Sequence, residues 1–155
     1  MDKISKRIFS GIGALKRLGP FVSLDTAKKI YDSLSQPHFD YCCTVWDGIN
    51  NQLTEKLQKL QNRAARVITK TSYEVSSSSL LDALGWEKLF FNGQKDKAIM
   101  VFKSLHNLTP VYLHNIFCNF NTHYSLLRKS TNKLILSKPR TEYLKRSFSY
   151  SGAAL

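Results

Sequence analysis

Residues 53–70 read LTEKLQKLQNRAARVITK and carry two stripes that repeat at steps of three and four residues. The apolar stripe consists of Leu53, Leu57, Leu60, Ala64, Val67 and Ile68, and the basic stripe consists of Lys56, Lys59, Arg63, Arg66 and Lys70. On a helix that turns about 100° per residue, the cations fill a sector about 80° wide beside an apolar sector about 100° wide. We therefore expect a helix over about residues 52–71 that buries one face and carries a row of positive charges on the surface next to that face.

Turn and cap signals divide the rest of the chain up to residue 118 into further helices. Apolar periodicity predicts them at about residues 3–18, 24–34, 37–46, 80–84, 88–105 and 110–117. Ser23 and the run Ser76-Ser77-Ser78-Ser79 offer N-caps, Gly85 closes a helix, and Thr109-Pro110 is typical of an N-cap followed by the first helical residue. The predicted fold is mainly α, an irregular multi-helix bundle with a helical, thumb-like domain over residues 1–118.

Beyond Cys118 the helical period is lost. Leu134-Ile135-Leu136 and the basic stretch that reaches Tyr150 indicate extended chain, with a short hairpin around Lys138-Pro139-Arg140. We therefore expect residues 119–155 to form a basic, partly extended C-terminal segment.

Composition limits the classes of protein to which the chain can belong. The 155 residues carry 23 Lys and Arg against 11 Asp and Glu, a formal charge of +12 that is typical of proteins that bind a polyanion. No apolar run approaches the roughly 18 residues of a membrane span, and the amino terminus lacks the apolar core of a secretion signal. We expect an intracellular protein, nuclear or cytoplasmic, without a membrane partner. The three cysteines have no Cys-x-x-Cys spacing, which favours small buried side chains over disulfides or zinc ligands.

The sequence offers no recognisable catalytic constellation. No two of its acids lie within four residues of one another, so a local pair that shares two Mg²⁺ ions is not expected. The four histidines show neither His-x-His nor His-Glu-x-x-His spacing, and there is no glycine-rich phosphate loop. We expect no catalytic residues, no metal, no cofactor and no small-molecule substrate.

A series of short motifs accompanies the striped helix. They are Ile4-Ser5-Lys6-Arg7, Gly13-Ala14-Leu15-Lys16-Arg17, Pro37-His38-Phe39-Asp40-Tyr41 with Trp46, Leu84-Gly85-Trp86, Phe102-Lys103-Ser104-Leu105-His106, Pro110-Val111-Tyr112-Leu113 and Arg146-Ser147-Phe148-Ser149-Tyr150. In this order and spacing they resemble the thumb and post-palm region of reverse transcriptases from non-LTR retrotransposons of the jockey-like and CR1-like type. The resemblance covers essentially the whole chain.

This resemblance implies a fragment of an RNA-directed DNA polymerase that lacks the catalytic palm and is cut at both ends. It implies two partners, the palm domain of the parent polymerase and the template–primer, an RNA or RNA–DNA duplex gripped through its backbone. The candidate nucleic-acid-binding residues are Lys6, Arg7, Lys16, Arg17, Lys56, Lys59, Arg63, Arg66, Lys70, Lys145 and Arg146. The last two lie among Tyr143, Phe148 and Tyr150, which are candidates for base stacking or, alternatively, for anchoring the tail on the bundle.

Two alternatives stay open at this point. Lysines and arginines often flank an apolar stripe only to cover its rim with their stems, and such a face binds nothing. Solvated helices usually mix charge signs, however, and Glu55 is the one acid near this basic sector. The second alternative is a relic helical scaffold or protein-interaction module with no nucleic-acid role.

Overall fold

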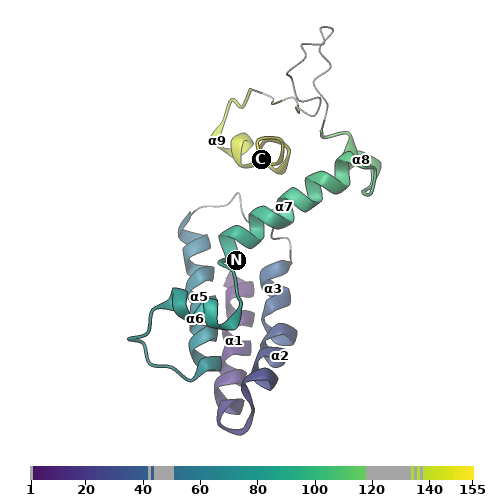
Figure 1. The fold of residues 1–155 in the computed structure, drawn as a ribbon. Coiled ribbons are helices and arrows are strands. Elements are labelled where there is room, and N and C mark those ends of the chain that lie inside the picture. Colours follow the sequence, from purple (N-terminus) through teal and green to yellow (C-terminus); the bar gives the residue numbers. More distant parts are fainter. Residues whose placement is uncertain (1, 42, 44–50, 118–133, 135, 137) are drawn as a thin grey trace, which may run out of the picture. The chain divides into compact units, whose positions relative to one another are not determined.

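The computed structural model describes residues 2–41, 43, 51–117, 134, 136 and 138–155 (Figure 1). Its helices are α1 (Asp2–Leu18), η1 (Gly19–Phe21), α2 (Leu24–Leu34), α3 (Gln36–Asp40), α5 (Asn51–Thr69), α6 (Ser77–Leu84), α7 (Leu89–Leu105), α8 (Val111–His114), α9 (Glu142–Arg146) and α10 (Phe148–Ala153). The described residues form helices and no strand, which confirms a mainly α, multi-helix fold. None of the described helices is both long and apolar enough to cross a membrane.

Three of the four predicted signals for a helix start or end are confirmed. The N–H of Thr26 donates to Ser23 Oγ at 3.3 Å, so Ser23 caps α2. The first serine of the Ser76–Ser79 run, Ser76, caps α6 in the same way, and Gly85 ends that helix with a φ of 71°. Thr109, by contrast, is not an N-cap. Pro110 is itself extended, with φ −55° and ψ 147°, so α8 begins one residue later than predicted and ends at His114.

The predicted helix over residues 37–46 is present as α3 only as far as Asp40. Residues 42 and 44–50 lie outside the described part, so the rest of that prediction is not tested. Among the cysteines, Cys43 is half-buried, while Cys42 and Cys118 also lie outside the described residues.

The prediction of an extended C-terminal segment is wrong for α9 and α10. The hydroxyls of Thr141 and Ser147 accept the N–H of the residue three positions on, at 3.3 Å from Leu144 and 3.4 Å from Tyr150, so each short helix begins at a capped residue. Helices of five and six residues are unstable alone and depend on tertiary contacts, which sequence periodicity does not report. Lys138, Pro139 and Arg140 lie in no strand, and part of the predicted hairpin falls outside the described residues.

The chain divides into two compact units, residues 1–43 with 50–92, and residues 44–49 with 93–155. The predicted domain boundary after residue 118 falls inside the second unit, next to a segment outside the described residues, and stays a prediction. In the first unit α1 packs against α2 and α5, and α5 packs against α6. Its centre is Tyr31, which is fully buried and stacks on Trp86 with ring centroids 4.3 Å apart.

Helix α5 buries a face slightly different from the predicted one. Leu57, Ala64 and Ile68 are buried as expected, but Ala65 and Gln61 are buried as well, so the buried face is centred farther from the cations. The Gln61 amide donates to the carbonyl of Glu87 at 3.1 Å, which satisfies a polar group in the core. Because the buried face is displaced in this way, the stripe residues Lys56, Lys59, Arg63 and Lys70 are exposed, and only Arg66 is half-buried.

The second unit has a small core of its own. Phe117 is buried and packs edge-to-face on Phe148, with centroids 5.4 Å apart. Gly152 of α10 is buried where an added Cβ would lie 2.9 Å from a methyl group of Val101. Close packing of α10 on α7 therefore requires the smallest residue at this position.

Candidate nucleic-acid interface

Helices α1 and α5 pack side by side and run in the same direction (Figure 1), and two pockets open along their line of contact. The first pocket, about 500 Å³ in volume, lies between the beginnings of the helices and is lined by Ser5, Lys6, Phe9, Lys56 and Leu60. The second, about 480 Å³ in volume, lies between their ends and is lined by Lys16, Gly19, Pro20, Arg63, Arg66, Val67, Lys70, Thr71 and Tyr73. We call the surface formed by these two pockets the α1/α5 groove. The groove places cations from both helices along the line of contact between α1 and α5.

Arg63 connects the two pockets. Its guanidinium carbon lies 4.7 Å from the ring centre of Phe9, which lines the first pocket and is 50% exposed. This cation–π contact positions the arginine, which is itself exposed and can still donate hydrogen bonds to a ligand. Sequence reasoning missed Phe9, although a large apolar residue outside the Ile8, Ile12 and Leu15 face of α1 was an available signal.

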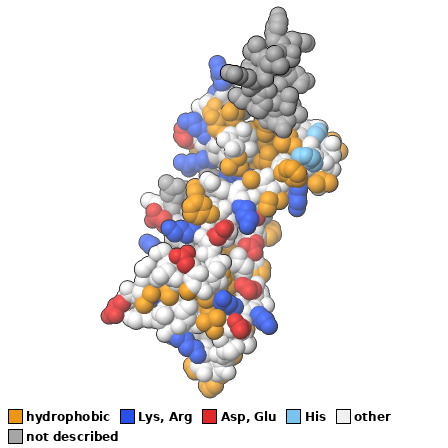
Figure 2. Space-filling view, in the orientation of Figure 1, with side chains coloured by type: hydrophobic (Ala, Val, Ile, Leu, Met, Phe, Trp, Pro, Cys, Tyr) orange, Lys and Arg blue, Asp and Glu red, His pale blue; other side chains and the backbone are white. Residues whose placement is uncertain are grey.

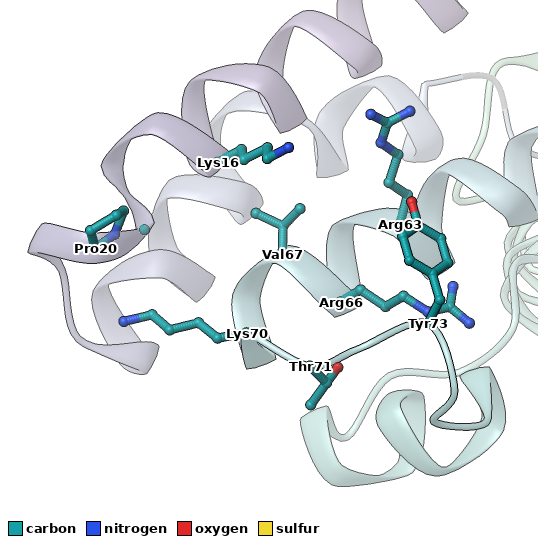
Figure 3. A pocket seen from close by; sticks show the side chains of 9 residues that line it. Lys16, Pro20, Arg63, Arg66, Val67, Lys70, Thr71 and Tyr73 are labelled. Atoms are coloured by element: carbon teal, nitrogen blue, oxygen red, sulfur yellow. The ribbon is translucent and has the colours of Figure 1, made fainter.

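The second pocket has an apolar floor with cations above it. Figure 3 shows the side chains of Lys16 and Arg63 directed toward the same space over Val67, one from each helix. Lys70 is directed the other way, toward Pro20. It follows the last residue of α5 and has a φ of 55°, so its side chain leaves the regular path of the stripe.

The Arg66 side chain makes contacts within the protein. Its guanidinium donates to Ser77 Oγ at 2.8 Å and lies 5.1 Å from the ring centre of Tyr73. The side chain is half-buried, and its Nε is buried without a hydrogen-bond partner. Arg66 therefore lines the second pocket while it fastens the loop that carries Tyr73 to the start of α6. Tyr73, 78% exposed, is the second aromatic residue that the sequence did not single out.

Three predicted residues of the first unit lie outside the groove lining. Lys59 is exposed and shares the basic sector of α5, but lines neither pocket. On α1, Arg7 stands about 160° around the helix from Phe9, and Arg17 about 100° from Lys16. The structure thus brings none of Lys59, Arg7 and Arg17 to the lining of either pocket.

Lys145 and Arg146 belong to α9 in the second unit. Lys145 pairs with Glu142 at 2.6 Å, and this hydrogen bond and the charge of Lys145 hold the pKa of the Glu142 carboxyl below its usual value. Both side chains are exposed, so the pair contributes little to stability. Of the neighbouring aromatics, Phe148 is packed on Phe117 rather than presented for stacking.

Carboxylates stay away from most of the groove cations. Among the described residues, none of the following makes an ion pair with an acid: Lys6, Lys16, Lys59, Arg63, Arg66 and Lys70. Elsewhere on the first unit, Figure 2 shows acidic and basic side chains mixed over the visible face, as on an ordinary solvated surface. Within the basic stripe of α5, Lys59 and Arg63 are therefore exposed and make no ion pair with a described acid, while Arg66 is bonded to Ser77 and Lys70 leaves the path of the stripe.

No group of three or more His, Cys, Asp or Glu side chains that could hold a metal ion occurs within the described ranges. Comparison of the chain with protein-family models, with curated proteins and with solved structures finds no match.

Proposed function

We propose that the α1/α5 groove binds the sugar–phosphate backbone of a nucleic-acid duplex, RNA or RNA–DNA, without reading base identity. One observation carries the proposal: two parallel helices contribute cations to a single groove, and four of them, Lys6, Lys16, Arg63 and Lys70, make no ion pair with an acid among the described residues. Phosphate contacts by lysine and arginine supply affinity through counterion release and carry no sequence information.

The length of the groove suits a backbone track. Lys6 and Lys16 are ten residues apart on α1, which corresponds to a rise of about 15 Å, and Lys56 and Arg66 are separated by the same rise on α5. One strand of B-form DNA advances about 3.4 Å along the helix axis per phosphate, and a strand of an A-form duplex advances less. The groove therefore spans at least about four phosphates of one strand.

We further propose that the chain is the thumb and post-palm part of a reverse transcriptase from a non-LTR retrotransposon, with no catalysis of its own and a palm domain as its protein partner. The motif order in the sequence supports this proposal, and a basic helical face behind a polymerase palm would hold the template–primer in place. An upstream reading frame that ends in palm motifs would test the origin directly.

Duplex binding is tested by fluorescence anisotropy of a labelled RNA–DNA hybrid at several salt concentrations. Five cations make no ion pair with a described acid and are available for phosphate contacts, namely Lys6, Lys16, Lys59, Arg63 and Lys70. At the B-form value of about −0.9 per contact, the slope of log affinity against log salt is expected near −4.5. The triple variant Lys6→Glu, Lys16→Glu, Arg63→Glu, at three residues that line the groove, is expected to bind more weakly, with a slope near −2 or shallower.

The matched control is Lys29→Glu, Lys88→Glu, Lys95→Glu. These three lysines are exposed, none lines the groove, and the variant changes the net charge by the same amount. Binding that does not depend on salt, or an equal loss in both triple variants, would show that overall charge rather than the groove is responsible.

A second candidate function is a protein-interaction module. Hydrophobic side chains gather over α7 and α8 in Figure 2, where Phe102, Val111 and Tyr112 are 56%, 72% and 69% exposed. Apolar patches of this kind mark interaction surfaces in soluble proteins. This candidate is favoured if the chain shows no salt-dependent affinity for any duplex.

A further inference from the structure

The second pocket of the groove differs from a plain phosphate-binding track. A backbone contact needs only cations, whereas this pocket combines cations with an apolar floor at Val67 and Pro20 and an aromatic wall at Tyr73. Its volume of about 480 Å³ falls within the range of pockets that hold small organic ligands, roughly 300–1,000 Å³. Chemically, the lining matches a ligand with both a flat apolar part and a negative charge.

Tyr73 is held as a platform. The Arg66 guanidinium lies 5.1 Å from its ring centre, and the same guanidinium is fastened to Ser77, so the loop and the ring are positioned together. The tyrosine nevertheless remains 78% exposed, which leaves ring surface for a ligand. An aromatic ring fixed before binding loses little conformational freedom when a base stacks on it.

The electrostatics of the pocket favour an anion. The ends of α1 and α5 each contribute about half a negative charge from the helix dipole. Four cations line the pocket, Lys16, Arg63, Arg66 and Lys70. Even after both helix ends are offset, a positive charge of about three remains. Lys16 and Arg63 are directed toward the same space above Val67 (Figure 3), where a phosphate would meet both.

We infer that this pocket binds a nucleoside phosphate, with the base stacked on Tyr73 and the phosphate between Lys16 and Arg63. The inference rests on the proposed duplex binding, because the pocket lies at one end of the groove and would receive an unpaired nucleotide that continues from the duplex. The groove thus discriminates a duplex with a single-stranded extension from a blunt one.

The test compares a blunt RNA–DNA hybrid with the same hybrid carrying a three-nucleotide extension, and uses AMP and inorganic phosphate as small probes. The wild-type chain is expected to bind the extended hybrid at least about fivefold more tightly than the blunt one, the lower limit for stacking of one base. Tyr73→Leu is expected to abolish this advantage without altering affinity for the blunt hybrid. Tyr73→Phe, which keeps the ring, is expected to retain it.

Tyr112→Leu is the matched control, since Tyr112 is similarly exposed, at 69%, and lies in the second unit. Circular dichroism shows whether each variant remains folded. AMP that binds in a Tyr73-dependent manner, while inorganic phosphate at the same concentration does not compete, supports the pocket even if the extension confers no advantage; the source of the ligand is then a free nucleotide.

Failure of the inference and failure of the proposed function are distinguishable. Salt-dependent binding of the blunt hybrid, with no extension advantage and no AMP binding, overturns the inference alone. Tyr73-dependent AMP binding without any duplex binding overturns the proposed function alone. Equal effects of Tyr73→Leu and Tyr112→Leu on the extended hybrid also overturn the inference, because they remove the specific role of the ring.

Discussion

Two glycines of α1 allow a sharp test of how this helix packs. Both Gly11→Ala and Gly13→Ala gain helix propensity of about 1 kcal/mol in the helix interior. A Cβ at Gly13 meets no atom within 4 Å, so this substitution is expected to stabilise the protein by about 0.5–1 kcal/mol. A Cβ at Gly11 would lie 2.6 Å from the Oγ of Ser35, which is fully buried. Overpacking costs about 1–3 kcal/mol, so the net effect there is a loss of about 0–2 kcal/mol.

The difference between the two variants isolates the packing cost, because the propensity gain cancels. Ser35→Ala removes the clashing atom, and it also removes a buried hydroxyl that has no hydrogen-bond partner among the described residues, so alone it is expected to be neutral or stabilising. In the double variant Gly11→Ala, Ser35→Ala the nearest remaining atom is Leu34 Cβ at 3.6 Å, an ordinary contact. The double-mutant cycle is therefore expected to show a coupling of about 1–3 kcal/mol.

Urea unfolding followed by tryptophan fluorescence measures these free energies. A Trp46→Phe background leaves Trp86, which stacks on Tyr31 in the core of the first unit, as the reporter of that unit. If Gly11→Ala and Gly13→Ala change the free energy of unfolding equally, within about 0.5 kcal/mol, or if the cycle is additive, the close approach of α1 to Ser35 is refuted.

Three further predictions follow from single side chains. Burial raises the pKa of the Tyr31 hydroxyl above its usual value near 10. The folded protein holds that proton more tightly than the unfolded chain, so urea unfolding should show stability falling above about pH 10, and falling less steeply in Tyr31→Phe. Arg66→Lys loses the guanidinium bond to Ser77, worth about 1.5–3 kcal/mol, so amide exchange in residues 71–76 should accelerate at least about tenfold. Glu142→Gln should leave the melting temperature unchanged, because the exposed pair with Lys145 contributes little to stability.

Each of these predictions has its own control. Alkaline unfolding that is equally steep in wild type and Tyr31→Phe assigns the loss to other groups. Ser77→Ala should accelerate the same amides as Arg66→Lys, and an unchanged loop in both variants contradicts the fastening role of the arginine. Glu87→Gln makes the same change in net charge at an exposed residue of the first unit, so a lower melting temperature for Glu142→Gln alone would show that the pair with Lys145 does contribute to stability.

Much of the fold was predictable because the residues that determine where a helix begins and ends lie within that helix or next to it. The two stripes of α5 repeat with the helical period, and Ser23, Ser76 and Gly85 act on backbone groups within a few residues of themselves. The C-terminal helices were not predictable in this way. They have five and six residues, and α10 depends on Gly152 fitting against Val101, a contact between residues far apart in the sequence.

The candidate site also has one part that the sequence predicts and another that only the tertiary structure determines. The basic sector of α5 is a property of its sequence alone, because every cation in it lies three or four residues from the next one. Only the tertiary structure decides that α1 runs parallel to α5, which brings Lys6 and Lys16 to the groove and leaves Arg7 and Arg17 away from it. The packing of one helix on another depends on contacts between side chains that are distant along the chain, and a local sequence pattern does not predict these contacts.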